Sequence, residues 1–179
     1  MLSKKLPLFN ALVVAVMLAG SLYALNPKLP RPLADISLDA PGAKRVNVRQ
    51  GVAKARIIAV LSSSCEHCIT MVSALSKIER QYRARGVQVF GALVDEEAGQ
   101  QLQKFIATTK PSFPIGTLSQ DNTRRLADFG IADHPFVPIL MFVDGKNMVR
   151  YQFDNESKIF NGSAEVTVKK MLELTLAAK

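Results

Sequence analysis

The chain has 179 residues, 48% of them hydrophobic, and only two cysteines, a length that suits one domain with a short additional segment. This hydrophobic content supports a buried core, so the chain does not need the disulfide framework of small secreted domains. The net charge of +8 comes from Lys and Arg residues that are scattered along the chain without a glycine-rich phosphate loop, which argues against a nucleic-acid-binding protein.

The amino terminus has the pattern of a targeting segment. Lys4 and Lys5 precede an apolar run from Leu6 to Leu25. Positive charge followed by an apolar run is typical of a secretory signal, and about 20 apolar residues also suffice to span a bilayer. We therefore expect an apolar helix at 1–25, either a signal peptide or a signal anchor, with the rest of the chain outside the cytoplasm. The proline-rich residues 26–34 are expected to form a linker.

One domain is expected over residues 35–179, and its elements alternate between strands and helices. A buried apolar strand at 56–61 leads into a helix from Cys65 to about Arg85, which Gly86 ends. The other predicted elements are strands at 36–38, 45–48, 87–94 and 113–115, helices at 100–109, 123–129 and 164–177, turns at Pro41-Gly42 and Asn161-Gly162, and a hairpin of strands 137–143 and 148–153 around Asp144-Gly145. This order predicts an α/β sandwich around a mixed sheet.

Both cysteines lie in Cys65-Glu66-His67-Cys68, between the strand at 56–61 and the helix that follows it. Two thiols at this spacing can form a disulfide or hold a metal together. As a structural crosslink such a disulfide would stabilise the fold only weakly, because loop-closure entropy grows with loop size. At the amino terminus of a helix, in contrast, unpaired N–H groups and the helix dipole stabilise a thiolate. We therefore predict that Cys65 is the exposed attacking sulfur and that Cys68 resolves the mixed disulfide.

Two further pairs of residues are predicted to act on this dithiol. His67 would stabilise the Cys65 thiolate and make the disulfide more oxidising, whereas the negative charge of Glu66 would act in the opposite direction. Pro138 begins a buried strand although proline cannot donate to a sheet. A cis Val137–Pro138 bond would explain this position and would present the Val137 backbone to an extended substrate segment.

The sequence resembles the thioredoxin fold, and specifically the extracytoplasmic TlpA/ResA-like thiol-disulfide oxidoreductases, over about residues 35–179. The resemblance is carried by the dithiol after an apolar strand, the inserted helix with Phe113-Pro114-Ile115, Phe129-Gly130-Ile131, and Val137-Pro138 six residues before Asp144-Gly145. It implies a three-layer sandwich with a central mixed sheet and no cofactor. By the same resemblance, Cys65 is the nucleophile, Cys68 the resolving thiol and Pro138 the cis proline.

The sequence departs from that family at three positions. Ser64 stands directly before the first cysteine, where the family usually has Trp, so an apolar platform for the substrate is missing. Ala59 and Met71 stand where relatives often have a buried Asp or Asn and a carboxylate, respectively. Proton transfer at the second cysteine is therefore expected to involve Glu66, His134 or water.

Two alternatives use the same thiols. Cys65 and Cys68, with His67 and His134, would give the two sulfurs and two nitrogens of a zinc or copper site. However, adjacent helical residues point about 100° apart, which makes it awkward for His67 and Cys68 to bind one metal ion. No metal is therefore assigned in the leading prediction.

A peroxiredoxin-type peroxidase is the other enzyme alternative. Its motif has Thr or Ser three residues and Pro seven residues before the nucleophile; Ser62 fits, but Ile58 occupies the proline position. The leading prediction is an oxidoreductase of protein thiols and disulfides, in the bacterial periplasm or on the outer face of the inner membrane, anchored by its amino terminus or secreted. A membrane thiol carrier would supply electrons if it reduces its clients, and a quinone-linked oxidoreductase would regenerate it if it oxidises them.

Overall fold

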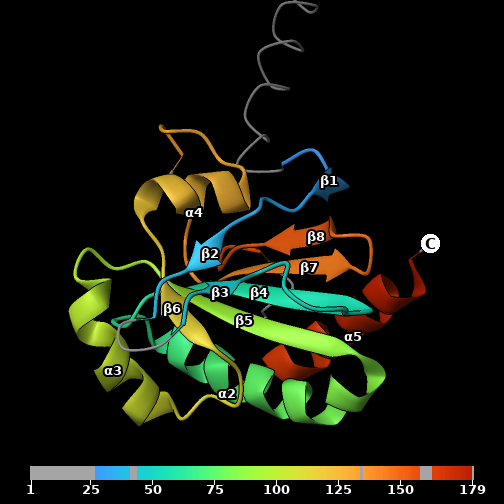
Figure 1. Cartoon of the computed structure of the whole chain (residues 1–179), viewed down its shortest axis with the longest axis horizontal. Coiled ribbons are helices and arrows are strands. Elements are labelled where there is room, and N and C mark those ends of the chain that lie inside the picture. Colours follow the sequence, from blue (N-terminus) through green and yellow to red (C-terminus); the bar gives the residue numbers. More distant parts are fainter. Residues whose placement is uncertain (1–26, 41–43, 134, 158–162, 179) are drawn as a thin grey trace, which may run out of the picture.

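Figure 1 shows the computed structural model of the chain, which describes residues 27–40, 44–133, 135–157 and 163–178. The strands are β1 (Arg31–Pro32), β2 (Ser37–Leu38), β3 (Val46–Asn47), β4 (Ala55–Leu61), β5 (Val87–Leu93), β6 (Ile115–Thr117), β7 (Ile139–Asp144) and β8 (Met148–Phe153). The helices are α2 (Glu66–Tyr82), α3 (Ala98–Thr109), α4 (Gln120–Ala127) and α5 (Ala164–Ala177), with a 3-10 turn, η1 (Arg83–Arg85), directly after α2.

Six strands form one sheet, in the order β1-β8-β7-β4-β5-β6, and β2 and β3 form a separate two-stranded ribbon. The strands β4, β5 and β6 run parallel to one another. Strand β7 runs antiparallel to β4, and β8 runs antiparallel to β7 across the predicted hairpin. The sheet is therefore mixed, which confirms the α/β architecture expected from the sequence.

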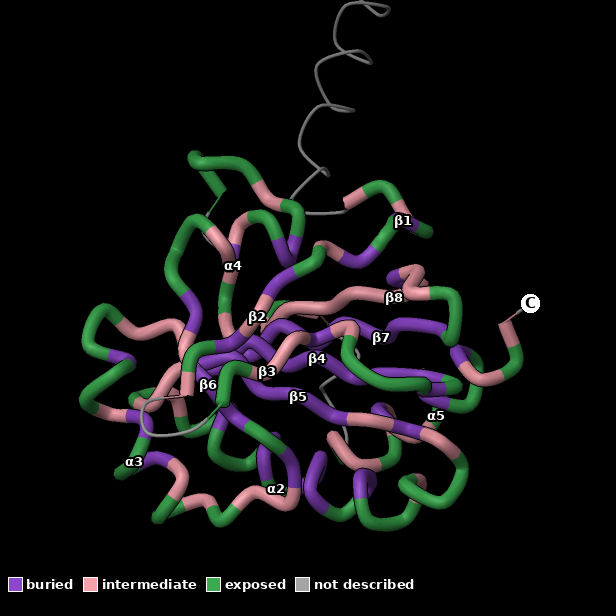
Figure 2. The backbone as a smooth tube through the Cα atoms, viewed as in Figure 1, coloured by how far each residue is buried: buried purple, intermediate pink, exposed green. Residues whose placement is uncertain are grey.

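The central strand β4 divides the core into two parts. Successive side chains of a strand point to opposite faces of a sheet. Accordingly, Ile57 and Leu61 join the core beneath α2, α3 and α5, whereas Ile58 and Val60 join the core on the α4 side. Figure 1 shows the three helices on one face and α4 on the other, and Figure 2 shows β4 buried between them. These are the layers of a three-layer sandwich.

Helix α2 follows the apolar spacing seen in the sequence. Its buried residues include Cys68 and, at helical spacing, four further apolar residues: Met71, Val72, Leu75 and Ile78. The helix continues into η1 and stops at Gly86, whose φ of +82° lies in the left-handed region that glycine adopts without strain. The predicted end of this helix is therefore confirmed.

Some predicted boundaries differ from the structure by two or three residues. Helix α4 begins at Gln120 rather than at 123, because Ser119 caps it by accepting the N–H of Asn122 at 3.4 Å. Strand β6 extends to Thr117 because the backbones of Thr117 and Asp39 exchange hydrogen bonds of 2.7 and 3.0 Å. Both differences arise from hydrogen bonds that the spacing of apolar residues in the sequence does not predict.

Part of the stretch expected to be a linker, residues 26–34, pairs with the sheet. Strand β1 pairs antiparallel with β8. The buried guanidinium of Arg31 donates to the Leu126 carbonyl at 2.8 Å and to the Gln152 side chain at 2.7 Å. Leu33 is also fully buried. Pro32 is tolerated because an edge strand has no neighbour on its outer side, so proline content alone does not distinguish a linker from an edge strand.

Several expectations fall on residues that the structure does not describe. They are the apolar helix at 1–25, the turns at Pro41-Gly42 and Asn161-Gly162, and His134. Among the helices of the described ranges, none is both long and apolar enough to cross a membrane. The division into 1–25, 26–34 and 35–179 stays a prediction.

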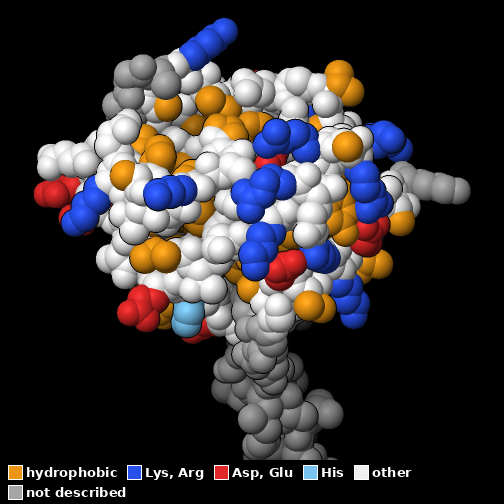
Figure 3. Space-filling view, turned by 90° about the horizontal axis from the view of Figure 1, so that it is seen from below, with side chains coloured by type: hydrophobic (Ala, Val, Ile, Leu, Met, Phe, Trp, Pro, Cys, Tyr) orange, Lys and Arg blue, Asp and Glu red, His pale blue; other side chains and the backbone are white. Residues whose placement is uncertain are grey.

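Lys and Arg side chains are spread over the face that α2, α3 and α5 form, which Figure 3 views directly. Several of them have acidic partners: Lys77 and Lys169 lie 3.5 and 2.7 Å from Glu165, and Arg83 lies 2.7 Å from Glu79. Exposed pairs of this kind contribute little to stability. They do make this face mixed in charge, as expected for a solvated surface.

Candidate active site

The two cysteines lie where β4 ends and α2 begins. Cys65 is the N-cap of α2, and its backbone is extended, with φ of −94° and ψ of 112°. Its sulfur accepts the N–H of Cys68 at 3.2 Å, as Ser, Thr or Asp oxygens do at most N-caps. The sulfur therefore occupies the place where free N–H groups and the helix dipole stabilise a negative charge. The predicted position of Cys65 at the helix amino terminus is confirmed.

The two sulfurs differ in their exposure. Cys65 is half-buried, whereas Cys68 has no exposed surface. The Cys68 sulfur accepts the N–H of Ser62 at 3.5 Å. Burial is the main cause that raises the pKa of the Cys68 thiol far above its ordinary value; its hydrogen bond with Cys65 and the charge of Asp95 raise this pKa further. Cys68 is therefore a protonated thiol at neutral pH, and Cys65 is the accessible sulfur.

The loop before β7 brings a second predicted pair to the dithiol. The Val137–Pro138 peptide bond is cis, as the sequence analysis expected. The Cys65 thiol donates to the Val137 carbonyl oxygen at 3.5 Å. Val137 is half-buried and Pro138 is buried. The structure thus places the Val137 backbone directly beside the accessible sulfur.

The two residues between the cysteines point outward. Glu66 and His67 are both exposed in the first turn of α2. His67 lines a cavity of about 490 Å³ between α2 and the start of α5, together with Met71 and Pro138. Because solvent screens exposed charges, the field of either side chain at the dithiol is weaker than that of a buried charge would be.

Ser64, which stands where the family usually has Trp, gives the dithiol a polar neighbour in the structure. Ser64 is exposed, and its hydroxyl lies 3.0 Å from that of Ser62, so this position offers no apolar platform. Apolar surface is available instead on the α4 side of the dithiol, in a cavity of about 510 Å³ whose lining includes Phe129, Ile131 and Val137. This cavity shares Val137 with the cysteine site.

An acidic residue of the site was missed in the sequence. Asp95 follows β5, and its carboxylate accepts the Ser62 hydroxyl at 2.5 Å and the Ser63 N–H at 2.8 Å. Because β4 and β5 are parallel neighbours, the residues after both strands meet at the same edge of the sheet. A signal was therefore present: a carboxylate directly follows one apolar strand and the dithiol loop follows the other.

Residues 30–152, more than half of the chain, match the sequence profile of the AhpC/TSA family. The chain belongs to the AhpC/TSA family. The matched residues run from just before β1 into β8, so they include both cysteines, Asp95 and the Val137–Pro138 bond. A comparison with the sequences of curated proteins finds no match.

Solved structures show the fold of this AhpC/TSA-family chain. A thioredoxin-family thiol:disulfide interchange protein from Chlorobium tepidum TLS aligns with a TM-score of 0.68 and 14% identity, covering 84% of this chain and 99% of that one. A putative thiol:disulfide interchange protein DsbE from Chlorobium tepidum gives 0.65 and 18%, covering 83% and 99%. A DsbF homologue from Corynebacterium diphtheriae gives 0.66 and 12%, covering 87% and 95%. At such identities the likeness shows a thioredoxin-like fold, which confirms the predicted fold.

The described part of this AhpC/TSA-family chain contains no cluster of side chains that supports the metal-binding alternative. No three His, Cys, Asp or Glu side chains in those ranges are placed to hold one metal ion. Of the four ligands considered, the structure brings Cys65 and Cys68 together and leaves His67 exposed on the first turn of α2. His134 lies outside the described residues.

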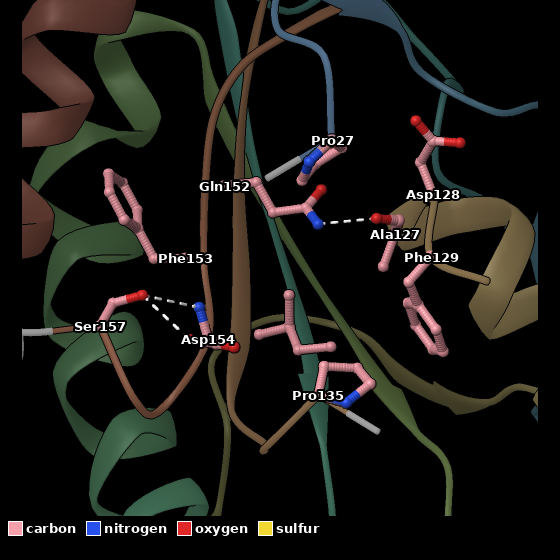
Figure 4. Close-up of a pocket in the computed structure, with 10 residues that line it drawn as sticks. Pro27, Ala127, Asp128, Phe129, Pro135, Gln152, Phe153, Asp154 and Ser157 are labelled. Carbon is pink, nitrogen blue, oxygen red and sulfur yellow. Dashed lines mark hydrogen bonds between the residues drawn. The ribbon is translucent and has the colours of Figure 1, made fainter. Parts of the chain in front are cut away.

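A smaller cavity, of about 90 Å³, lies between β8 and the end of α4 (Figure 4). Three hydrogen bonds are seen there (Figure 4): the Gln152 amide donates to the Ala127 carbonyl at 2.7 Å, the Asp154 N–H donates to the Ser157 hydroxyl at 3.2 Å, and that hydroxyl donates to the Asp154 carboxylate at 3.0 Å. Pro27 also lines this cavity, but neither cysteine does. Its volume corresponds to only about three water molecules, which is too small for a substrate segment. The cavity is therefore not part of the dithiol site.

The buried thiol of this AhpC/TSA-family chain predicts a pH dependence of stability. Because the pKa of Cys68 is raised in the folded state, the folded protein keeps this proton when the unfolded chain, whose thiol pKa is about 8.5, has lost it. The stabilisation is thus complete below about pH 8.5 and is lost progressively above it. Relative to Cys68→Ala, we expect the free energy of unfolding of the reduced wild type to fall by about 1.4 kcal/mol per pH unit above pH 8.5. Urea unfolding between pH 7 and 10 measures this, and equal slopes would contradict it.

Proposed function

We propose that the chain is an extracytoplasmic thiol-disulfide oxidoreductase that exchanges a Cys65–Cys68 disulfide with protein cysteines. The observation that carries this proposal is the asymmetry of the dithiol. The Cys65 sulfur is accessible at the N-cap of α2, while the Cys68 thiol is buried one turn behind it and kept protonated. An accessible attacking thiol beside a buried resolving thiol is the arrangement that two-step exchange requires.

In the reducing direction, the Cys65 thiolate attacks one sulfur of a substrate disulfide. The substrate S–S bond breaks, a mixed disulfide forms at Cys65, and the released substrate sulfur takes up a proton. Cys68 then loses its proton and attacks the Cys65 sulfur, which releases the second substrate thiol. Two electrons and two protons pass from the dithiol to the substrate, and the protein retains a Cys65–Cys68 disulfide. The oxidising direction runs through the same steps in reverse.

The backbone at Val137 is proposed to hold the substrate during the attack. Its carbonyl oxygen is 3.5 Å from the Cys65 sulfur, so an extended segment aligned along Val137 would place its own cysteine beside Cys65. Pro138 fixes the start of β7 immediately after this backbone. Glu66 and His67, exposed at the helix start, are proposed to tune the redox potential in opposite directions.

The proposed location follows from the amino terminus. Lys4 and Lys5 before the apolar run of residues 6–25 support export, with the domain either anchored or secreted. An exported dithiol needs an electron partner at the membrane. A membrane thiol carrier would serve a reductant, and a quinone-linked oxidoreductase would serve an oxidant.

A trapping experiment tests this function. In Cys68→Ser the first step is retained but the resolving thiol is absent, so client proteins are expected to accumulate as mixed disulfides on Cys65. The variant is expressed in cells, the thiols are blocked in acid, and the adducts are identified by non-reducing electrophoresis and mass spectrometry. The double variant Cys65→Ser/Cys68→Ser is the control. If the single variant captures no more protein than the double variant, the proposed function is wrong.

A peroxidase is the second candidate function, because peroxiredoxins also belong to the AhpC/TSA family and Ser62 occupies their Thr/Ser position. Here the thiolate would attack a peroxide oxygen, giving a sulfenic acid and water or an alcohol. However, the Ser62 hydroxyl donates its proton to the Asp95 carboxylate at 2.5 Å, so this proton is already engaged. Peroxide consumption with dithiothreitol as reductant distinguishes the two functions: we expect no catalysis above the background rate of dithiothreitol.

A further inference from the structure

The carboxylate of Asp95 lies against the dithiol loop, yet the exchange steps above do not use it. One oxygen accepts the Ser62 hydroxyl at 2.5 Å and the other accepts the Ser63 N–H at 2.8 Å. The backbone N–H of the same Ser62 donates to the Cys68 sulfur at 3.5 Å. A continuous set of contacts therefore joins the Asp95 carboxylate to the buried sulfur through one residue.

Asp95 itself is held by regular structure on both sides. Directly before it, the Val94 N–H donates to the Leu61 carbonyl at 3.0 Å, which joins the end of β5 to the end of β4. Its own carbonyl oxygen accepts the Ala98 N–H, also at 3.0 Å, at the start of α3. The Ser63 hydroxyl also donates to Gln101 of α3. The loop that precedes the cysteines is thus attached to a rigid carboxylate rather than to solvent.

We propose that Asp95 is a positioning residue that fixes the Ser62–Ser64 loop and, through its negative charge, lowers the redox potential of the Cys65–Cys68 pair. The inference rests on the proposed function, since it requires that the two cysteines form a disulfide. The physical reason is electrostatic: the disulfide carries no charge, whereas the dithiol gains negative charge whenever one of its thiols ionises. A fixed negative charge beside the pair disfavours the reduced form relative to the disulfide. The dithiol is then a stronger reductant than the same dithiol without Asp95.

The variant Asp95→Asn separates charge from position. Its amide oxygen can accept the Ser63 N–H, and its amide nitrogen can donate to the Ser62 oxygen, so both links are kept while the charge is removed. The equilibrium is protein disulfide plus two glutathione molecules giving protein dithiol plus glutathione disulfide. We expect its constant to rise by about tenfold in this variant, equivalent to about 30 mV for a two-electron couple. The matched control is Glu96→Gln, because Glu96 is the adjacent carboxylate but is exposed.

The outcomes are distinct. A shift toward the dithiol in Asp95→Asn that is absent from Glu96→Gln supports the inference. An unchanged constant in Asp95→Asn, or an equal shift in Glu96→Gln, overturns it while leaving the proposed function intact. If the wild type forms no Cys65–Cys68 disulfide at any glutathione ratio, the proposed function fails, and the inference fails with it.

A second variant tests whether Asp95 only holds the loop. Asp95→Ala removes both hydrogen bonds and is expected to lower the urea midpoint of unfolding and to shift the glutathione equilibrium at least as far as Asp95→Asn does. If Asp95 only held the loop, Asp95→Ala would lower the midpoint while Asp95→Asn kept the wild-type equilibrium constant, and that result would overturn the proposed role of the charge.

Discussion

Replacing Cys65 by Ser is expected to reduce thiol-disulfide exchange by at least about 10³-fold, to the rate seen without enzyme. A hydroxyl at this position cannot form a disulfide, and its pKa is too high for it to ionise at neutral pH. Cys68 cannot take over the attack, because it is fully buried and its pKa is raised. The rate of insulin reduction with dithiothreitol measures the loss.

The matched variant for this experiment is Cys68→Ser. It keeps the accessible sulfur, so it should still be alkylated by iodoacetamide at the wild-type rate in a single, rapid phase. Cys65→Ser should be alkylated only slowly in the folded state and rapidly in urea, where the buried thiol becomes exposed. Rapid alkylation of folded Cys65→Ser would show that the roles of the two sulfurs have been assigned the wrong way round.

Replacing Phe142 by Ala is expected to lower the free energy of unfolding by about 3–5 kcal/mol. Phe142 lies in β7 without exposed surface, and its ring meets that of Phe153 edge to face, with centroids 6.2 Å apart. Truncation removes the buried ring and leaves a cavity at the centre of the sheet. Equilibrium unfolding in urea, followed by far-UV circular dichroism, measures the change.

Phe136→Ala is the matched control for this core substitution. Phe136 is 57% exposed in the loop before β7, so the same truncation should change the free energy of unfolding by only about 0.5 kcal/mol. Equal losses in the two variants would mean that the core does not lie where the structure places it.

The elements that sequence analysis predicted correctly are those with a local signal. Strand β4 is an uninterrupted apolar run from Ile57 to Leu61, and α2 shows apolar residues at helical spacing before the chain turns at Gly86. The β7–β8 hairpin has its Asp144-Gly145 turn at the expected place. The dithiol is recognisable because its two cysteines are three positions apart, within one turn at the start of a helix. The cis bond at Pro138 is predictable because a proline at the start of a buried strand is unusual.

The features that were missed depend on contacts between distant parts of the chain. Strand β1 exists because Arg31 pairs with Val149 and sends its side chain to Leu126. Asp95 belongs to the site because two parallel strands end together, a fact that depends on strand order. The neighbouring strands had each been predicted, but a single sequence does not state which of them are adjacent.

Because β1 is part of the sheet, only a short segment of chain separates the folded domain from residues 1–25. The chain is fixed at Arg31, and Pro27 already lies against the small cavity beside β8. A fully extended chain covers at most about 3.4 Å per residue, so residues 26–30 reach at most about 17 Å. If the apolar run is retained in a bilayer, as proposed for the anchored form, the reach of this tether is about half the thickness of the hydrocarbon core. In that form the domain would stay close to the membrane surface, so clients would have to approach the membrane to reach the dithiol.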